Sequence, residues 1–147
     1  MWLSRRLTNR LKDFRGEPNT GKWDRLHMPI SEPNLYGEDD TTYLMGAEFL
    51  QDVGMVEDWG CGIGGFRKFC KTPYIGVDGS RGAFIDRIAD LETYGSHADG
   101  IFMRQVLEHN YRWQPILDSA LASFTLKMCL VIFTPFAKAH SRDRLQS

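Results

Sequence analysis

The sequence predicts an α/β fold built on a mainly parallel sheet. Short apolar runs of strand length alternate with stretches whose apolar residues have helical spacing, as in right-handed βαβ units. The run at 128–133 is apolar throughout, which is typical of a strand buried on both faces of a parallel sheet. A second run ends at residue 59, and four glycines follow it within six positions. Such a loop lets a strand bring its backbone close to a ligand.

Residues 1–38 are predicted to precede the sheet domain, which we place at 39–147. Apolar residues at helical spacing, with five basic residues between them, predict a basic amphipathic helix at 2–15. This helix either packs over the sheet with its basic face in solvent, or serves as a lid or as a contact to a phosphate-bearing substrate or a membrane surface.

The stretch 16–38 is predicted to be an irregular connection, because it contains three glycines and three prolines. It also carries three large side chains, Trp23, His27 and Tyr36. These side chains either cover the core or line a pocket for a substrate or a cofactor.

Each element of the sheet domain follows from a local signal. Asp39 or Asp40 can cap a helix that continues through Leu50, and Gly54 suits the stop of that helix. The glycine-rich loop opens a short helix near 66–70. The remaining pattern predicts strands at 55–59, at 74–78, within 83–89, at 98–103 and at 128–133, with a helix at 113–124.

The bulk composition narrows the classes of function. The chain has 147 residues, of which 42% are hydrophobic and 25% charged, and this suits one globular domain. A net charge of −1 does not single out nucleic acid as a partner. Three cysteines without metal-ligand spacing indicate a reduced, cytoplasmic location and no metal site. No apolar stretch reaches about 18 residues, so we expect no transmembrane segment.

The glycine-rich loop has a spacing of its own. Residues 58–64 read Asp-Trp-Gly-Cys-Gly-Ile-Gly, whereas dinucleotide-binding folds use G-x-G-x-x-G. A helix that follows such a loop points its first N–H groups at the same ligand. The loop therefore indicates a nucleotide-like cofactor at the carboxyl end of the first strand.

Asp78 ends the second predicted strand, within Ile-Gly-Val-Asp-Gly-Ser. A carboxylate at this place can accept hydrogen bonds from both ribose hydroxyls of an adenosine. The alternative is an ordinary aspartate that caps a turn with Ser80. Asp78 follows Gly64 by only 14 residues, compared with ~20 in most nucleotide-binding units, so the helix between them must be short.

These segments resemble, in order, the motifs of the class I S-adenosylmethionine (SAM)-dependent methyltransferases, of the type 11 and type 12 kind. Residues 58–64 fit D-x-G-x-G-x-G of motif I, and Asp78 lies in a form of motif II, G-V-D-x-S. Residues 98–109 resemble motif IV with the turn after it, because Val-Leu-Glu-His at 106–109 matches the ending V-L-E-H. The resemblance covers about 40–136.

The resemblance implies a three-layer Rossmann-like sandwich with strand order 3-2-1-4-5. It also implies SAM as methyl donor, S-adenosylhomocysteine as product, and an acceptor that the sequence does not identify. A carboxylate after the third strand accepts from the adenine amino group in the family, and Asp90 resembles it. The implied cofactor contacts are Asp58, Trp59, Gly60, Cys61, Gly62, Gly64, Asp78, Gly79, Asp90, Leu91, Arg104 and Gln105.

Three residues at the family's motif IV carry further expectations. Arg104 stands where the family usually has a small or polar residue, and it suits a bidentate pair with the SAM carboxylate or an acidic substrate, or else is a surface arginine. His109 is a candidate general base, although in the family this histidine more often supports the local fold. Glu108 is a second catalytic candidate, or only a favourable partner of a helix dipole.

The carboxyl end departs from the family. The family's core continues past the fifth strand with a helix and two more strands, whereas only 137–147 follow here. We therefore expect a sheet that lacks the last two strands, with the fifth strand as an edge. That edge pairs in a homodimer, is covered by the N-terminal segment, or belongs to a fragment of a longer protein.

Three functions remain open from the sequence. The first is methyl transfer to a phosphosugar, a lipid precursor, a small metabolite or RNA, and the basic helix at 2–15 favours an anionic acceptor. The second is SAM binding without turnover, in a partner subunit or a regulatory module. The third is an NAD-binding oxidoreductase, against which the glycine spacing and the Val-Leu-Glu-His segment both argue.

Overall fold

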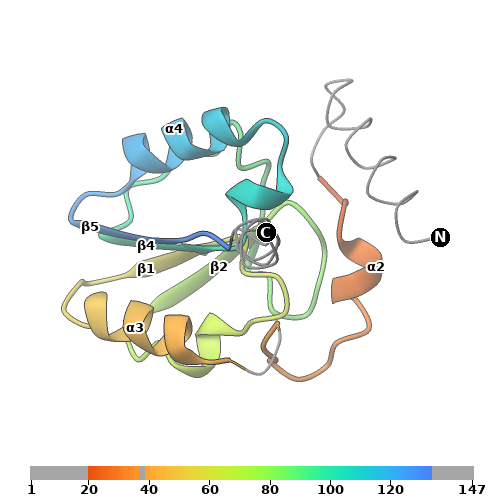
Figure 1. Ribbon diagram of the computed structural model, residues 1–147, viewed down its shortest axis with the longest axis horizontal. Helices are drawn as coiled ribbons and strands as arrows, with labels where there is room; N and C mark the ends of the chain where they lie inside the picture. Colours follow the sequence, from red (N-terminus) through yellow and green to blue (C-terminus); the bar gives the residue numbers. More distant parts are fainter. Residues whose placement is uncertain (1–19, 37–38, 134–147) are drawn as a thin grey trace, which may run out of the picture.

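The computed structural model describes residues 20–36 and 39–133, and within them it has one parallel five-stranded sheet. The strand order is β3-β2-β1-β4-β5, so the predicted α/β class and the order 3-2-1-4-5 are both confirmed. This is a Rossmann-like arrangement with β1 at its centre (Figure 1). The strands are β1 Val56–Trp59, β2 Tyr74–Asp78, β3 Arg87–Ile88, β4 Gly100–Arg104 and β5 Lys127–Val131.

Within the described residues, one α-helix covers each face of the sheet. Helix α3, Thr41–Phe49, lies on one face and helix α4, Trp113–Ser123, on the other (Figure 1). Alternate side chains of each strand point to opposite faces, so two cores form. The core on the α3 face contains Tyr43, Leu50, Val56, Phe66 and Phe102. The core on the α4 face contains Trp59, Val77, Ile101, Met103, Ile116 and Ala120.

The other helices of the described residues are short. The helix expected near 66–70 is a single 3-10 turn, η1 Phe66–Lys68, as the 14-residue gap before Asp78 requires. A second 3-10 turn, η2 Leu107–His109, follows β4. Helix α3 ends at Phe49, with Leu50 as its C-cap, and so stops before Gly54. The predicted helix at 2–15 lies outside the described residues.

Residues 20–36, which we call the strap, contact the loops at the carboxyl ends of β1 and β2. The Gly21 N–H donates to the carbonyl of Gly79 at 2.6 Å, and the Trp23 N–H donates to Ser80 Oγ at 2.8 Å. Asn34 donates in the same way to Ile63 at 3.1 Å. The prediction of an irregular connection is corrected at one place, where helix α2, Asp24–His27, forms (Figure 1).

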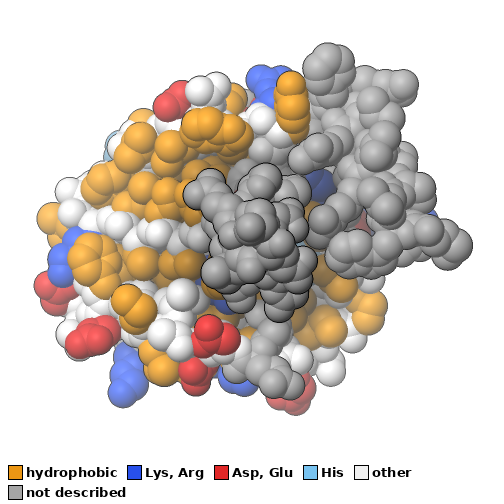
Figure 2. Space-filling model, viewed as in Figure 1, with side chains coloured by type: hydrophobic (Ala, Val, Ile, Leu, Met, Phe, Trp, Pro, Cys, Tyr) orange, Lys and Arg blue, Asp and Glu red, His pale blue; other side chains and the backbone are white. Residues whose placement is uncertain are grey.

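Strand β5 corrects the expectation of a strand buried on both faces. All five of its residues are only partly buried, because β4 is its sole neighbour within the described residues. Apolar side chains gather over α4 and this edge of the sheet (Figure 2). Exposed ones include Leu121 on α4, Leu126 just before β5 and Ile132 just after it. None of the helices in the described part of the chain is long and apolar enough to cross a membrane.

Candidate functional site

The glycine-rich loop leaves β1 with three residues in the left-handed region. The φ angles are 80° at Gly60, 51° at Gly62 and 80° at Gly64. At Gly62 a Cβ would lie 2.6 Å from the Tyr36 hydroxyl, so both backbone conformation and space require glycine. At Gly60 a Cβ would meet the side chain of Val106. The loop is therefore closely packed between the strap and the segment after β4.

Asp78 is held at the carboxyl end of β2 by two backbone donors. The Gly62 N–H donates to Oδ2 at 3.0 Å, and the Ser80 N–H donates to Oδ1 at 2.8 Å. The residue is only 5% exposed, and burial raises its pKa above the ordinary value, while these two N–H groups act in the opposite direction. Each carboxylate oxygen keeps a lone pair for a further donor, so the pair of oxygens suits a vicinal diol.

A pocket of about 270 Å³ lies beside Asp78, near the low end of the ~300–1,000 Å³ that small-molecule sites span. It brings together residues from the glycine loop, from β2, from the turn after β3 and from the end of β4. The sequence-predicted residues in its lining are Gly60, Gly62, Asp78, Gly79, Leu91, Arg104, Gln105 and His109.

Two of the predicted residues outside this lining point into the two cores. Asp58 lies on the α3 face, where its Oδ2 accepts from the Tyr74 hydroxyl at 2.7 Å, and burial raises its pKa to about 7. Trp59 lies on the α4 face, fully buried, and its Nε1 donates to Glu57 at 2.9 Å. Both side chains therefore belong to the interior of the sheet.

The other predicted residues outside the lining have local partners. Asp90 accepts from the backbone of Glu92 at 3.0 Å, as a turn residue does, and Gly64 packs against Phe84. Cys61 donates its S–H to the Phe84 carbonyl at 3.7 Å, and burial raises the pKa of this thiol well above its usual value.

His109 and Glu108 have different positions in η2. His109 lines the pocket, its ring meets Trp23 edge-on at 6.0 Å, and its carbonyl accepts from Lys22 Nζ at 2.9 Å. Glu108 is absent from the lining, and its Oε1 accepts from the Phe133 N–H at 2.9 Å. The Oε2 atom of Glu108 is buried without a hydrogen-bond partner within the described residues.

The strap supplies residues that the motifs could not assign to the site. Trp23, His27 and Tyr36 line the pocket together with Leu26, so the pocket-lining alternative holds for all three large side chains. His27 Nε2 shares a hydrogen bond of 2.8 Å with the Tyr36 hydroxyl, whereas its Nδ1 is buried without a partner in the described part of the chain. Burial lowers the pKa of His27 below its ordinary value, although the carboxylates of Asp78 and Asp24 act in the opposite direction. Aromatic residues in a Gly- and Pro-rich stretch were the only sequence signal for this wall.

The segment around η2 adds Val106 and Asn110 to the lining, and helix α4 adds Ile116. Gln105, beside them, has φ 56° and is the only non-glycine residue with a positive φ among those described. Such backbone costs about 1–3 kcal/mol and often occurs at functional sites. No cluster of three or more potential metal ligands occurs within residues 20–36 and 39–133.

The described residues thus form a Rossmann-like fold whose pocket lies at the carboxyl ends of the strands, compatible with a nucleotide- or SAM-binding enzyme. No protein-family model matches this sequence, and a search of curated proteins gives no match either.

Proposed function

We propose that this protein is a SAM-dependent methyltransferase. The observation that carries the proposal is the Asp78 carboxylate, held by the N–H groups of Gly62 and Ser80 at the wall of the pocket. This places a fixed pair of acceptors at the wall of a pocket that Gly60 and Gly62 of the glycine loop also line. An adenosine ribose is a ligand that fits both features.

The lining residues divide between the parts of such a cofactor. With SAM bound, Asp78 would accept from the ribose hydroxyls and Leu91 would offer an apolar contact to the base, while Gly60 and Gln105 would be left for the amino-acid end. When bound, SAM supplies a methyl group already activated on a sulfonium, so the chemistry is largely that of the cofactor. The task left to the chain is to align the acceptor and to exclude water, and Trp23 and Tyr36 of the strap support the second role.

His109 is our candidate for removal of a proton from the acceptor. It lines the pocket from the turn after β4, whereas Glu108 is turned toward the backbone of Phe133. An acceptor hydroxyl has to lose its proton, and a histidine is the side chain that most often takes it. Glu108 then acts as a positioning residue for the segment after β5.

Calorimetry on the purified chain tests the proposal. We expect binding of SAM and S-adenosylhomocysteine but not of NAD, and a loss of at least about tenfold in Asp78→Ala, since hydrogen bonds to a charged group are worth roughly 1.5–3 kcal/mol. Asp118→Ala is the matched control, because Asp118 is exposed on α4. Binding of NAD alone, or equal affinity of a folded Asp78→Ala protein, would contradict the proposal.

Turnover needs its own measurement. Transfer of a labelled methyl group from SAM to a panel of phosphorylated and carboxylated acceptors should be detected and should fall in His109→Ala. A protein that binds S-adenosylhomocysteine but transfers no methyl group to any acceptor would instead be the non-catalytic binding module.

A further inference from the structure

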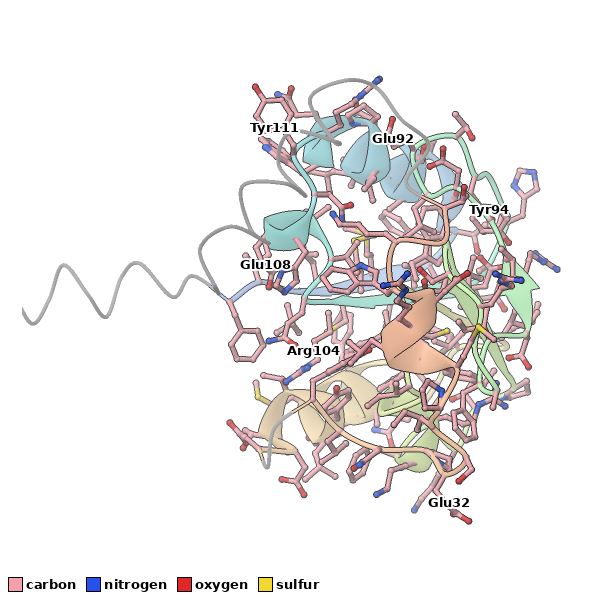
Figure 3. All side chains as sticks on the ribbon, turned by 90° about the vertical axis from the view of Figure 1, so that its right-hand side faces the viewer. Glu32, Glu92, Tyr94, Arg104, Glu108 and Tyr111 are labelled. Carbon is pink, nitrogen blue, oxygen red and sulfur yellow. The ribbon has the colours of Figure 1, made fainter. Side chains whose placement is uncertain are left out.

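Arg104 is a nearly buried cation in the wall of the pocket. It is the last residue of β4, it is 8% exposed, and it lies on the α3 face of the sheet (Figure 3). Glu108, the next acidic residue along the chain, lies toward the opposite face (Figure 3). Burying a guanidinium removes its hydration, and this is costly unless an anion or several hydrogen-bond acceptors replace the water.

The partners of Arg104 within the described residues are all uncharged. Nε donates to Thr42 Oγ1 at 2.9 Å, and Nη1 donates to the Tyr43 hydroxyl and to Gln105 Oε1, each also at 2.9 Å. The guanidinium carbon lies 4.1 Å from the centre of the Tyr43 ring and 4.8 Å from that of Phe133. These contacts hold the plane of the guanidinium in one orientation.

No carboxylate oxygen in residues 20–36 or 39–133 lies within 4.0 Å of a guanidinium nitrogen of Arg104, the distance that an ion pair requires. Nη2 makes no hydrogen bond to any described residue. Asp39 is exposed, and its pKa is lowered mainly by hydrogen bonds from Thr41 and less by Arg104. Asp58 is committed to Tyr74, and burial raises its pKa to about 7. The charge of Arg104 is thus left largely uncompensated.

The surroundings of Arg104 also suit an incoming anion. The Thr42 and Tyr43 hydroxyls accept from the guanidinium, so each retains its own proton to donate elsewhere. A guanidinium with a free edge and two oriented hydroxyls is a recognised receptor for a planar carboxylate or a phosphate. Lysine would offer the charge without the fork.

We infer that Arg104 forms an anion subsite of the pocket and pairs with a carboxylate or phosphate of the bound ligand. The inference rests on the proposed function only in that the anion is carried by a ligand of that same pocket. Two sources supply this chemistry, the carboxylate of the cofactor's amino-acid end and the acidic group of an acceptor.

Three probes separate the sources. S-adenosylhomocysteine carries a carboxylate, 5′-methylthioadenosine has the same nucleoside without it, and inorganic phosphate represents the anion alone. If the cofactor supplies the anion, Arg104→Gln weakens the binding of S-adenosylhomocysteine at least tenfold and leaves the affinity for 5′-methylthioadenosine unchanged. If the acceptor supplies it, both nucleosides bind as before, and phosphate binding to the S-adenosylhomocysteine complex is lost. Arg25→Gln is the matched control, because it removes the same positive charge from an exposed position on α2.

Thermal unfolding without ligand distinguishes a binding role from a structural one. Removal of an uncompensated buried charge should leave Tm unchanged or raise it in Arg104→Gln, while the stabilisation given by the ligand decreases. A lower Tm with every probe bound as in the wild type would overturn the inference. If Arg104→Gln does not fold, Arg104→Lys keeps the charge and should show the same loss to a smaller degree.

The outcomes also separate this inference from the proposed function. If neither nucleoside binds the wild type, the methyltransferase proposal fails, and phosphate titrated into the free protein still tests the subsite. Phosphate binding that is present in the wild type and absent in Arg104→Gln would uphold the subsite. Equal phosphate affinity in both proteins would exclude it.

Discussion

Two aspartates near the carboxyl ends of neighbouring strands lie in different surroundings. Asp78 faces the pocket between two backbone N–H donors, whereas Asp58 faces the core and has a tyrosine hydroxyl as its donor. Two fixed donors and a pocket suit a carboxylate that binds a ligand. One hydroxyl and full burial instead favour an acid that keeps its proton, and burial raises the pKa of Asp58 to about 7.

The raised pKa of Asp58 makes stability depend on pH. Between about pH 4 and pH 7 the folded protein holds a proton that the unfolded chain has released, so the free energy of unfolding falls as pH rises. From about pH 5 to pH 8 this contribution amounts to about 3 kcal/mol. In urea unfolding, the unfolding free energy of Asp58→Asn should therefore fall less between these pH values than that of the wild type. Parallel pH curves for both proteins would show that Asp58 titrates normally.

At the scale of elements, the glycine loop depends on side chains far away in sequence. Tyr36 from the strap and Val106 from the turn after β4 occupy the places where Cβ atoms of Gly62 and Gly60 would lie. Gly62 also donates the N–H that holds Asp78. The loop, the strap and the carboxylate therefore form one unit.

Gly62→Ala should damage this unit. The positive φ alone costs about 1–3 kcal/mol for alanine, and the new Cβ displaces the Tyr36 hydroxyl. We expect a lower unfolding free energy and at least tenfold weaker S-adenosylhomocysteine binding in the same variant. Gly95→Ala is the control, since nothing lies within 4 Å of a Cβ there. Equal effects of the two substitutions would mean that the loop can rearrange freely.

The elements also show what the sequence could predict and why. Strand β2 and helix α4 match their predicted ranges to within one residue because their signals are local: Pro73 stands directly before β2, and apolar residues recur at helical spacing in α4. The side chains of Asp58 and Trp59 enter the two cores because successive side chains of β1 point to opposite faces of the sheet. The match to a glycine-loop motif does not predict these directions. The sequence does not decide whether the strap lines the pocket, because the position of the strap depends on contacts between residues distant in sequence, such as Gly21 with Gly79.

For the whole molecule, the described residues leave β5 as an edge strand beside exposed Leu126 and Ile132. Unpaired strand edges with apolar neighbours favour association with another chain. We expect concentration-dependent dimers in sedimentation velocity, weakened in Leu126→Lys. Ile88→Lys, on the opposite edge strand β3, is the matched control, as Ile88 is similarly exposed. A protein that is monomeric at all concentrations would refute pairing through β5.

Strand order also has a consequence for the synthesis of the chain. The central strand β1 pairs with β2, which follows it closely, and with β4, which begins only at Gly100. A ribosome that adds about 5–20 residues each second needs a few seconds to pass from β2 to β4. During that time one side of Val56–Trp59 has no partner strand, so the nascent chain exposes unpaired backbone N–H and C=O groups to neighbouring chains. Slower translation across 79–99 should therefore increase aggregation during synthesis, although the finished protein would be unchanged.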